Sequence, residues 1–88
     1  MIYDFKYGVF LHLILIIVFG FVYKSLGTSH FAGITDESID YFYLSSTIQS
    51  TVGFGDIIPK TKLAKKWIIL QEVLIILVTG IFIINALY

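Results

Sequence analysis

The sequence predicts an all-α membrane protein of one domain, residues 1–88, in which two transmembrane helices flank a short re-entrant helix and a loop. Three observations lead to this fold class. Hydrophobic residues make up 58% of the chain and charged residues only 14%, whereas soluble domains average about 45–50% and about 25%. The apolar residues lie in two blocks, and a short amphipathic stretch lies between them. A soluble enzyme with a roomy cleft is excluded, because so small a domain buries too little of its surface.

Charge and cysteine content exclude further classes of protein. Six lysines balance six acidic residues, and the chain contains no cysteine. Without a basic surface we expect no nucleic-acid partner. Disulfides and thiolate metal sites are likewise excluded. We therefore expect no enzyme and no cofactor, and a lipid bilayer as the surroundings.

The first transmembrane helix is predicted at residues 7–24. Its apolar run, VFLHLILIIVFGFVY, is near the lower limit for crossing a hydrocarbon core about 30 Å thick. A signal peptide is the weaker interpretation, because Asp4 dilutes the positive charge and no cleavage site follows before Lys24. His12 interrupts the run without ligand partners nearby in the sequence, so we expect a packing role rather than metal binding.

The second transmembrane helix is predicted at residues 67–88, with Trp67 and Tyr88 where interfacial aromatic residues belong. Gln71 and Glu72 are unexpected here, since an ionisable group inside a membrane costs about 2.5–3.5 kcal/mol. Two interpretations stay open. Glu72 either bonds to the preceding short helix, at Ser45 or Ser46, or remains hydrated near the interface together with Gln71.

The connection divides into three parts before the second span. Residues 25–35 contain glycines and small polar residues and predict an exposed loop with a solvated His30. Residues 36–50 predict a helix with Asp36 or Ser38 as its N-cap. This helix is too short to cross a bilayer, which favours a re-entrant position. Residues 57–66 form an outer loop.

The most specific stretch is Ser-Thr-Val-Gly-Phe-Gly-Asp at residues 50–56. It resembles the selectivity-filter signature of potassium channels, Thr-Val-Gly-Tyr-Gly-Asp, with Phe54 in place of tyrosine. The whole layout is similar to the miniature potassium channels of algal viruses. The resemblance implies a turret loop at residues 25–35, a re-entrant pore helix at 36–50 and a selectivity-filter loop at 51–56. An ordinary turn and a phosphate-binding loop are the less favoured alternatives.

The chemistry of a filter explains these residue types. A potassium ion must exchange its water for fixed oxygens, and rings of backbone carbonyls supply them. Consecutive carbonyls face one axis only when alternate residues take unusual dihedrals, which Gly53 and Gly55 reach at little cost. The ion-binding residues are expected to be Thr51, Val52, Gly53, Phe54 and Gly55, with K+ on the carbonyls of the first four. One loop supplies only part of each ring, and the resemblance implies a homotetramer.

Further roles follow from the same resemblance. Tyr43, Thr47, Ser50 and Asp56 are expected to support the filter, with Asp56 held by Tyr43, Thr47 or water.

The second span is expected to line the inner pore. Ile76, Thr79 and Ile83 share one helix face, and the resemblance places this face toward the inner cavity and gate. Gly80 is either a hinge or a close-packing contact.

The expected function is passive, potassium-selective conduction. The alternatives are a cation channel of relaxed selectivity and a non-conducting two-span protein that associates with or regulates a host channel. Five of six lysines lie in the connection, so the positive-inside rule alone would make it cytoplasmic, whereas the resemblance places it outside. Small size and the layout shared with viral channels imply a viral, multi-pass membrane protein in the host plasma membrane or an internal membrane such as that of mitochondria. A cellular origin and an excised pore module are the alternatives.

Overall fold

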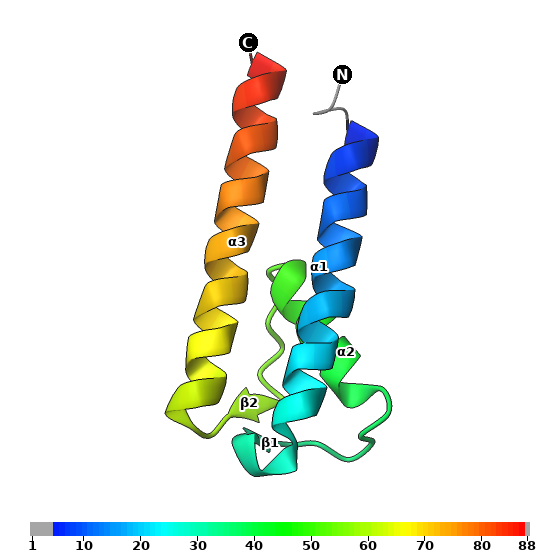
Figure 1. Ribbon diagram of the computed structural model, residues 1–88, viewed down its shortest axis with the longest axis vertical. Coiled ribbons are helices and arrows are strands. Elements are labelled where there is room, and N and C mark those ends of the chain that lie inside the picture. Colours follow the sequence, from blue (N-terminus) through cyan, green and yellow to red (C-terminus); the bar gives the residue numbers. More distant parts are fainter. Residues whose placement is uncertain (1–4, 88) are drawn as a thin grey trace.

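The computed structural model describes residues 5–87 as two long helices joined by a compact connection (Figure 1). The elements in chain order are α1 (Phe5–Leu26), the 3-10 helix η1 (Thr28–His30), β1 (Phe31–Ala32), α2 (Asp40–Gln49), β2 (Ile58–Pro59) and α3 (Lys62–Leu87). Helix α1 begins and α3 ends at the same end of the molecule, which we call the terminal end. The strands lie at the opposite end, called the connection end. Near it α2 crosses α1, and the last turn of α2 lies between the two long helices (Figure 1).

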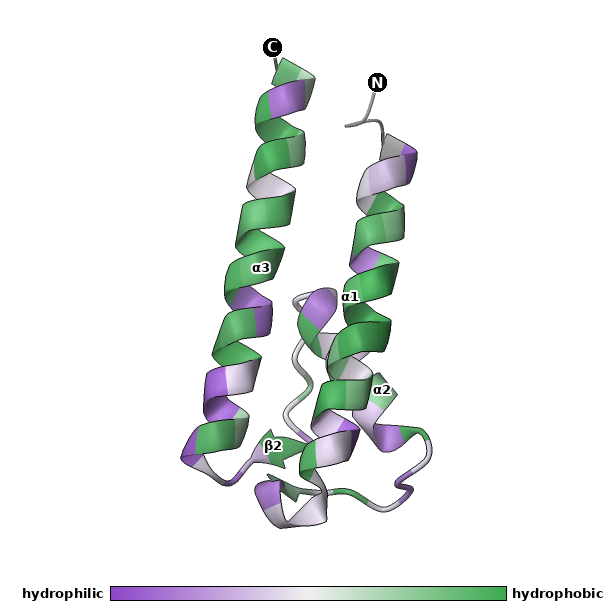
Figure 2. Cartoon of the chain, in the orientation of Figure 1, coloured by the Kyte–Doolittle hydropathy of each residue, from purple (hydrophilic) through white to green (hydrophobic). Residues whose placement is uncertain are grey.

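Both long helices are apolar and long enough to cross a membrane, over Lys6–Leu26 and Lys62–Leu87. Figure 2 shows hydrophobic residues along most of their length and hydrophilic residues gathered at the connection end. Most of these apolar side chains are exposed in the single chain. Helices satisfy their backbone hydrogen bonds internally, so such faces are stable against lipid or against other copies of the chain.

Both long helices extend beyond the ranges of the predicted spans. Helix α3 begins five residues before Trp67, because Thr61 caps its first turn: the Ala64 amide donates to Thr61 Oγ1 at 3.2 Å, and the Lys65 amide donates to the Thr61 carbonyl at 3.0 Å. The expectation for Tyr88 as an interfacial aromatic lies outside the described residues.

Helix α2 is shorter than the predicted range of 36–50, and neither Asp36 nor Ser38 is its N-cap. The cap position is Ile39, which makes no side-chain cap bond. Asp36 Oδ1 instead accepts from the Ser38 amide and hydroxyl at 2.9 and 2.6 Å. This local turn competes with the helix, as aspartate side chains often do. The bond from the Ser38 hydroxyl is the main cause that lowers the pKa of Asp36.

The expected turret loop is tied to the segment that follows the 51–56 loop. Strands β1 and β2 pair antiparallel, Phe31 with Pro59 and Ala32 with Ile58. The His30 carbonyl accepts from the Lys60 amide at 2.8 Å, and His30 Nδ1 lies 2.6 Å from Thr61 Oγ1. His30 is therefore half-buried and bonded rather than solvated, which corrects the expectation from its loop position.

The core lies at the connection end, where all elements meet. It consists of the buried residues Phe19, Tyr23, Phe31, Tyr41, Leu44, Ile57 and Ala64. The rings of Tyr23, Phe31 and Tyr41 pack edge to face, with neighbouring centroids 5.6 and 5.9 Å apart. A Cβ at Gly20 would collide with the Phe42 ring, so this glycine lets α2 approach α1 closely. The packing holds α2, and with it the start of the 51–56 loop, against both long helices.

Candidate functional site

The start of the 51–56 loop is bonded through its backbone to two carbonyls in the last turn of α2. The amides of Val52 and Gly53 donate to the Thr47 carbonyl at 3.0 and 3.1 Å, and the Thr51 amide donates to Ile48 at 3.0 Å. Ser50 lies at the C-cap, and its hydroxyl donates to the Thr47 carbonyl at 3.3 Å. The first half of the loop is thus anchored to buried Thr47 through the backbone.

Every second residue from 51 to 55 has a left-handed backbone. The φ angles of Thr51, Gly53 and Gly55 are 66°, 56° and 80°, whereas Val52 and Phe54 have negative φ. The two glycines were expected to do this, but Thr51 was not. A left-handed conformation costs a residue with a Cβ about 1–2 kcal/mol, and a β-branched residue adopts it rarely. Consecutive backbone carbonyls can face the same side of the chain only when the backbone conformation alternates in this way.

The far end of the loop is held by α2 as well. The Tyr43 hydroxyl donates to Asp56 Oδ2 at 2.8 Å, and the rings of Tyr43 and Phe54 stack with centroids 6.3 Å apart and planes at 3°. Of the partners considered for Asp56, the structure shows Tyr43, while the Thr47 hydroxyl donates to the Leu44 carbonyl at 2.8 Å. The hydrogen bond to Asp56 is the main cause that raises the pKa of the Tyr43 phenol.

Gly33 brings a third segment to the same place. A Cβ on this residue would collide with the Asp56 carbonyl oxygen. The turn after β1 therefore passes directly against the end of the 51–56 loop. The loop is consequently bounded by α2 on one side and by the β1 segment at its outer end.

A set of buried and half-buried hydrogen bonds joins α1, α2 and α3. We call it the polar chain, and its members are Tyr23, Gln71, Ser45, Gln49 and His12. Gln71 is fully buried, at 0% exposure. Its Oε1 accepts from the Tyr23 hydroxyl at 2.6 Å. Its Nε2 donates to Gln49 Oε1 at 3.0 Å and to the Ser45 carbonyl and hydroxyl at 3.2 Å each.

The polar chain continues from α2 to α1 at two points. Gln49 Nε2 lies 2.7 Å from His12 Nδ1, and the Ser45 hydroxyl donates to the Ile16 carbonyl at 2.8 Å. His12 therefore has a hydrogen-bond partner that the sequence did not indicate. Gln49 was missed altogether, although a polar residue on the buried side of an amphipathic helix was the available signal.

Gln71, rather than Glu72, makes the bond to Ser45. Glu72 is exposed in the single chain and lines a groove of about 270 Å³ with Thr51, Gly53 and Ile76. The Ser46 hydroxyl donates to the Tyr43 carbonyl at 2.8 Å, so the expectation that Glu72 bonds to Ser45 or Ser46 is wrong. The expectation that Gln71 stays hydrated is wrong too, because the three helices enclose it.

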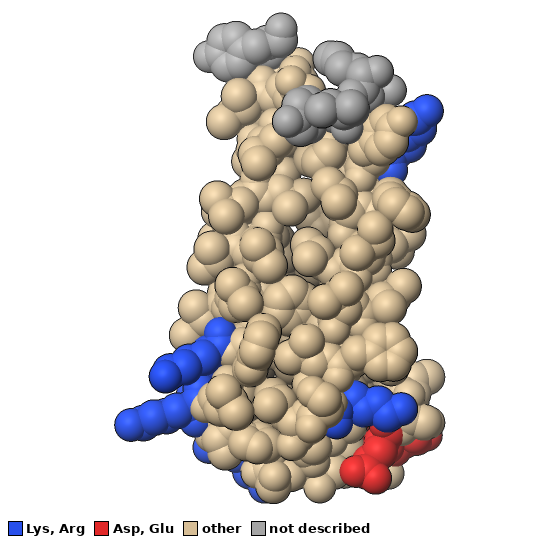
Figure 3. All heavy atoms as spheres, in the orientation of Figure 1, with Lys and Arg blue, Asp and Glu red and all other residues tan. Residues whose placement is uncertain are grey.

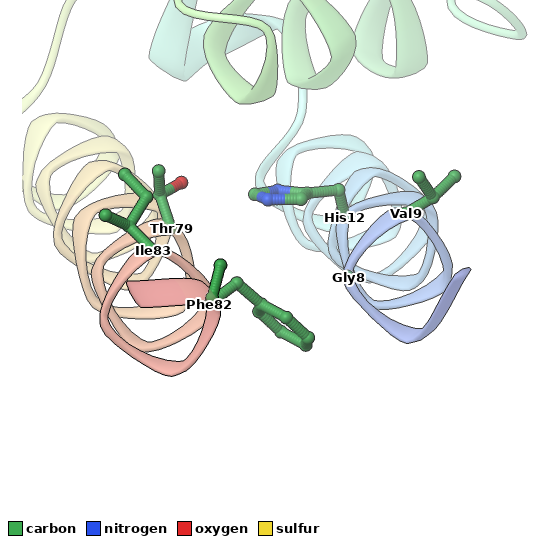
Figure 4. Close-up of a pocket in the computed structure, with 7 residues that line it drawn as sticks. Gly8, Val9, His12, Thr79, Phe82 and Ile83 are labelled. Carbon is green, nitrogen blue, oxygen red and sulfur yellow. The ribbon is translucent and has the colours of Figure 1, made fainter. Parts of the chain in front are cut away.

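The expected cavity face of α3 lies beside the loop. Thr79 lines a groove with Thr51 and His12. Thr79 and Ile83 also line a groove of about 320 Å³ between α1 and α3, into which the His12 ring points (Figure 4). A Cβ at Gly80 would meet nothing within 4 Å, so no described residue packs closely there, and α3 continues through it.

A model of the ion channel family matches residues 11–87. The chain belongs to this ion channel family. No significant match is found among curated proteins or among solved structures. The family and the two long apolar helices together make the protein a membrane protein that functions as an ion channel, and the family suggests a non-enzyme.

Most charged side chains visible in Figure 3 gather at the connection end of this ion channel, and one basic side chain lies near the terminal end. The lysines there are Lys24, Lys60, Lys62, Lys65 and Lys66, all exposed. Asp40 Oδ2 accepts from the amides of Asp36 and Thr35 at 2.9 and 2.8 Å, and these bonds lower its pKa, the Asp36 amide most. Among the described residues of this end, Asp36, Asp40 and Asp56 bond to amides and hydroxyls rather than to lysines.

Proposed function

We propose that four copies of this chain form a potassium-selective channel that conducts K+ passively through a central pore. In this proposal the 51–56 loop is the selectivity filter and α2 is the pore helix. The observation that carries it is the left-handed backbone at every second residue from Thr51 to Gly55. That conformation occurs in the segment whose sequence resembles the filter signature of potassium channels.

Backbone carbonyls are the groups that would select the ion. Rings of carbonyl oxygens replace the water shell of K+, and their number and field strength decide which cation passes. Thr51, Val52, Gly53 and Phe54 would supply these oxygens, and no charged side chain is required. The C-terminal end of α2, at Gln49, would add a partial negative charge that favours a cation.

The exposure of the loop supports assembly from several copies. Val52 and Phe54 are 55% and 67% exposed in the single chain, although apolar side chains favour burial. In a closed ring of identical chains, neighbouring copies would cover them and complete each ring of carbonyls. The fourfold symmetry comes from the resemblance to potassium channels. Ile76, Thr79 and Ile83 would then line the cavity below the filter.

The layout supports a place among miniature channels like those of algal viruses, with the connection end outside. Such a channel would act in the host plasma membrane or in an internal membrane. Accessibility of an epitope inserted at Ser29, compared with one after residue 88, tests the orientation. Labelling of the Ser29 epitope from outside intact cells supports it, and labelling only after permeabilisation contradicts it.

Recordings from purified protein in a planar lipid bilayer test the function. With K+ on one side and Na+ on the other, the reversal potential is expected to lie far toward the K+ equilibrium value, and Ba²⁺ is expected to block the current. A reversal potential near zero would indicate a cation channel of relaxed selectivity. Absence of current from verified tetramers would favour the non-conducting regulator instead.

A further inference from the structure

The polar chain has a direction along Tyr23, Gln71, Gln49 and His12, because each of the first three side chains donates to the next. The Tyr23 hydroxyl donates to Gln71 Oε1, Gln71 Nε2 donates to Gln49 Oε1, and Gln49 Nε2 points at His12 Nδ1. An amide group has donors on one side and an acceptor on the other. The orientation of the Gln71 amide therefore determines that of the Gln49 amide. The Gln49 amide in turn determines whether His12 Nδ1 must accept or donate a hydrogen bond.

The Ser45 carbonyl prevents reversal of this direction. It lies 3.2 Å from Gln71 Nε2, and a carbonyl oxygen can only accept. Rotating the Gln71 amide by half a turn would place two acceptors against each other in a fully buried site, which is costly. With Gln71 held this way, Gln49 presents its NH₂ group to α1. This contact therefore requires His12 Nδ1 to accept, which an imidazole with a proton on that nitrogen cannot do.

His12 lies where protons can reach it and where the loop begins. Its ring is half-buried and lines the grooves beside Ser50, Thr51 and Thr79. Its partner, Gln49, is the last residue of α2, two residues before the loop starts. A proton on Nδ1 would set two donors against each other at this contact and break it.

No other titratable side chain among the described residues faces His12 across these grooves. The end of α2 and the residues after it contribute Gln49, Ser50 and Thr51, and α3 contributes Ile75, Thr79, Phe82, Ile83 and Ala86. Glu72 lines the neighbouring groove with Thr51 and does not line either groove that contains His12. Lys6 and Tyr7 lie on α1 itself, more than a turn before His12.

We propose that neutral His12 is a positioning residue for the 51–56 loop, and that a proton on its Nδ1 opens the polar chain and reduces conduction. This role rests on the proposed channel function. It acts through Gln49, which ties the end of α2 to α1. The structure therefore makes the ion pathway responsive to pH at the terminal end, although no charged side chain lines the loop carbonyls.

Nitrogen NMR of the imidazole rings tests the direction of the polar chain without measuring conduction. Protein labelled with ¹⁵N-histidine in lipid bilayers, carrying His30→Gln so that only His12 reports, is expected to show the neutral Nε2–H tautomer at pH 8. The Gln49→Glu variant presents only acceptors to His12, so the tautomer is expected to change to Nδ1–H. An Nδ1–H tautomer in the protein with Gln49 intact would overturn the proposal.

Bilayer currents test the functional consequence. Acidifying only the terminal side from pH 8 to 5.5, where imidazoles ordinarily titrate, is expected to lower the K+ current about tenfold, within the usual range of coupling between two sites. His12→Asn retains an acceptor near the Nδ1 position and does not titrate, so its currents at the two pH values should have a ratio near one. The same acidification on the connection side serves as the control.

The outcomes separate this role from the proposed function. K+ current at pH 8 that does not fall on acidification, or an equal fall in His12→Asn, overturns the role of His12 and leaves the channel function standing. Absence of K+ current at both pH values overturns both. A pH-dependent wild-type current together with a pH-independent His12→Asn current supports the proposal.

Discussion

Replacing Gly55 with L-alanine and with D-alanine isolates the backbone requirement of the 51–56 loop. Gly55 has a φ of 80°, where an L-residue pays about 1–2 kcal/mol. A Cβ at this position would meet nothing within 4 Å in the chain, so steric collision inside the subunit adds nothing to this free-energy cost. The cost corresponds to about a 5- to 30-fold loss of the loop conformation in each subunit. In a ring of four subunits these losses multiply.

Chemical synthesis and ligation give both variants of so short a chain, and bilayer recordings compare them. We expect L-alanine at position 55 to abolish K+ conduction or its selectivity, because the left-handed backbone becomes unfavourable. D-alanine adds the same methyl group but favours positive φ, so selective conduction should survive. Fully selective conduction by the L-alanine channel would refute the reasoning. Equal loss in both variants would show that the added methyl group, rather than the backbone angle, is responsible.

Three further predictions concern the contacts that hold α2. Gln71→Leu removes hydrogen bonds to three side chains of the polar chain. At about 0.6 kcal/mol for each bond inside a membrane, their loss should lower the free energy of unfolding by about 2 kcal/mol per chain in detergent. The control variant Val73→Leu, on the exposed face, should not lower this free energy. Tyr43→Phe keeps the ring stack but removes the hydrogen bond to the Asp56 carboxylate, and such bonds usually contribute about 1.5–3 kcal/mol. Single-channel open times should therefore shorten at least about tenfold. Unchanged open times would contradict a supporting role for Tyr43. The pKa of Asp40 is lowered in the folded chain. Its hydrogen bonds therefore stabilise the fold fully above the pKa of the unfolded carboxyl group, about 3.9. This stabilisation disappears as the pH falls through the lower pKa of the folded state. Thermal unfolding measured between pH 6 and 3 should therefore show that the unaltered chain loses stability more steeply than Asp40→Asn does. Identical dependence of stability on pH in the two proteins would contradict this.

Much of this channel's organisation could be predicted from the order of its residues. Two apolar blocks long enough to span a bilayer became α1 and α3, because hydrophobic length depends on composition and not on tertiary contacts. A short amphipathic stretch became α2 for a similar reason. Gly53 and Gly55 were expected at positive φ, since their lack of a Cβ is a local property. These features needed no knowledge of what packs against them.

Other features depend on which segments meet in space. Gln71 and Glu72 are neighbours on one helix, and only the position of α2 decides that Gln71 is enclosed and Glu72 faces a groove. The polar chain includes a hydrogen bond between residues 48 positions apart, Tyr23 and Gln71, so no local sequence pattern could predict it. Thr51 takes a left-handed backbone against its own preference, because its amide and those after it bond to the last turn of α2.

The sequence alone therefore determined that this protein has two spans, a short helix and a glycine-containing loop of a particular signature. The tertiary structure decided how that loop is held. The Thr47 carbonyl binds its start, Tyr43 binds Asp56, and the polar chain ties α2, from which the loop begins, to both long helices. The physical reason is that hydrophobicity and backbone freedom belong to single residues. Hydrogen bonds between buried polar groups exist only once packing has brought donor and acceptor together.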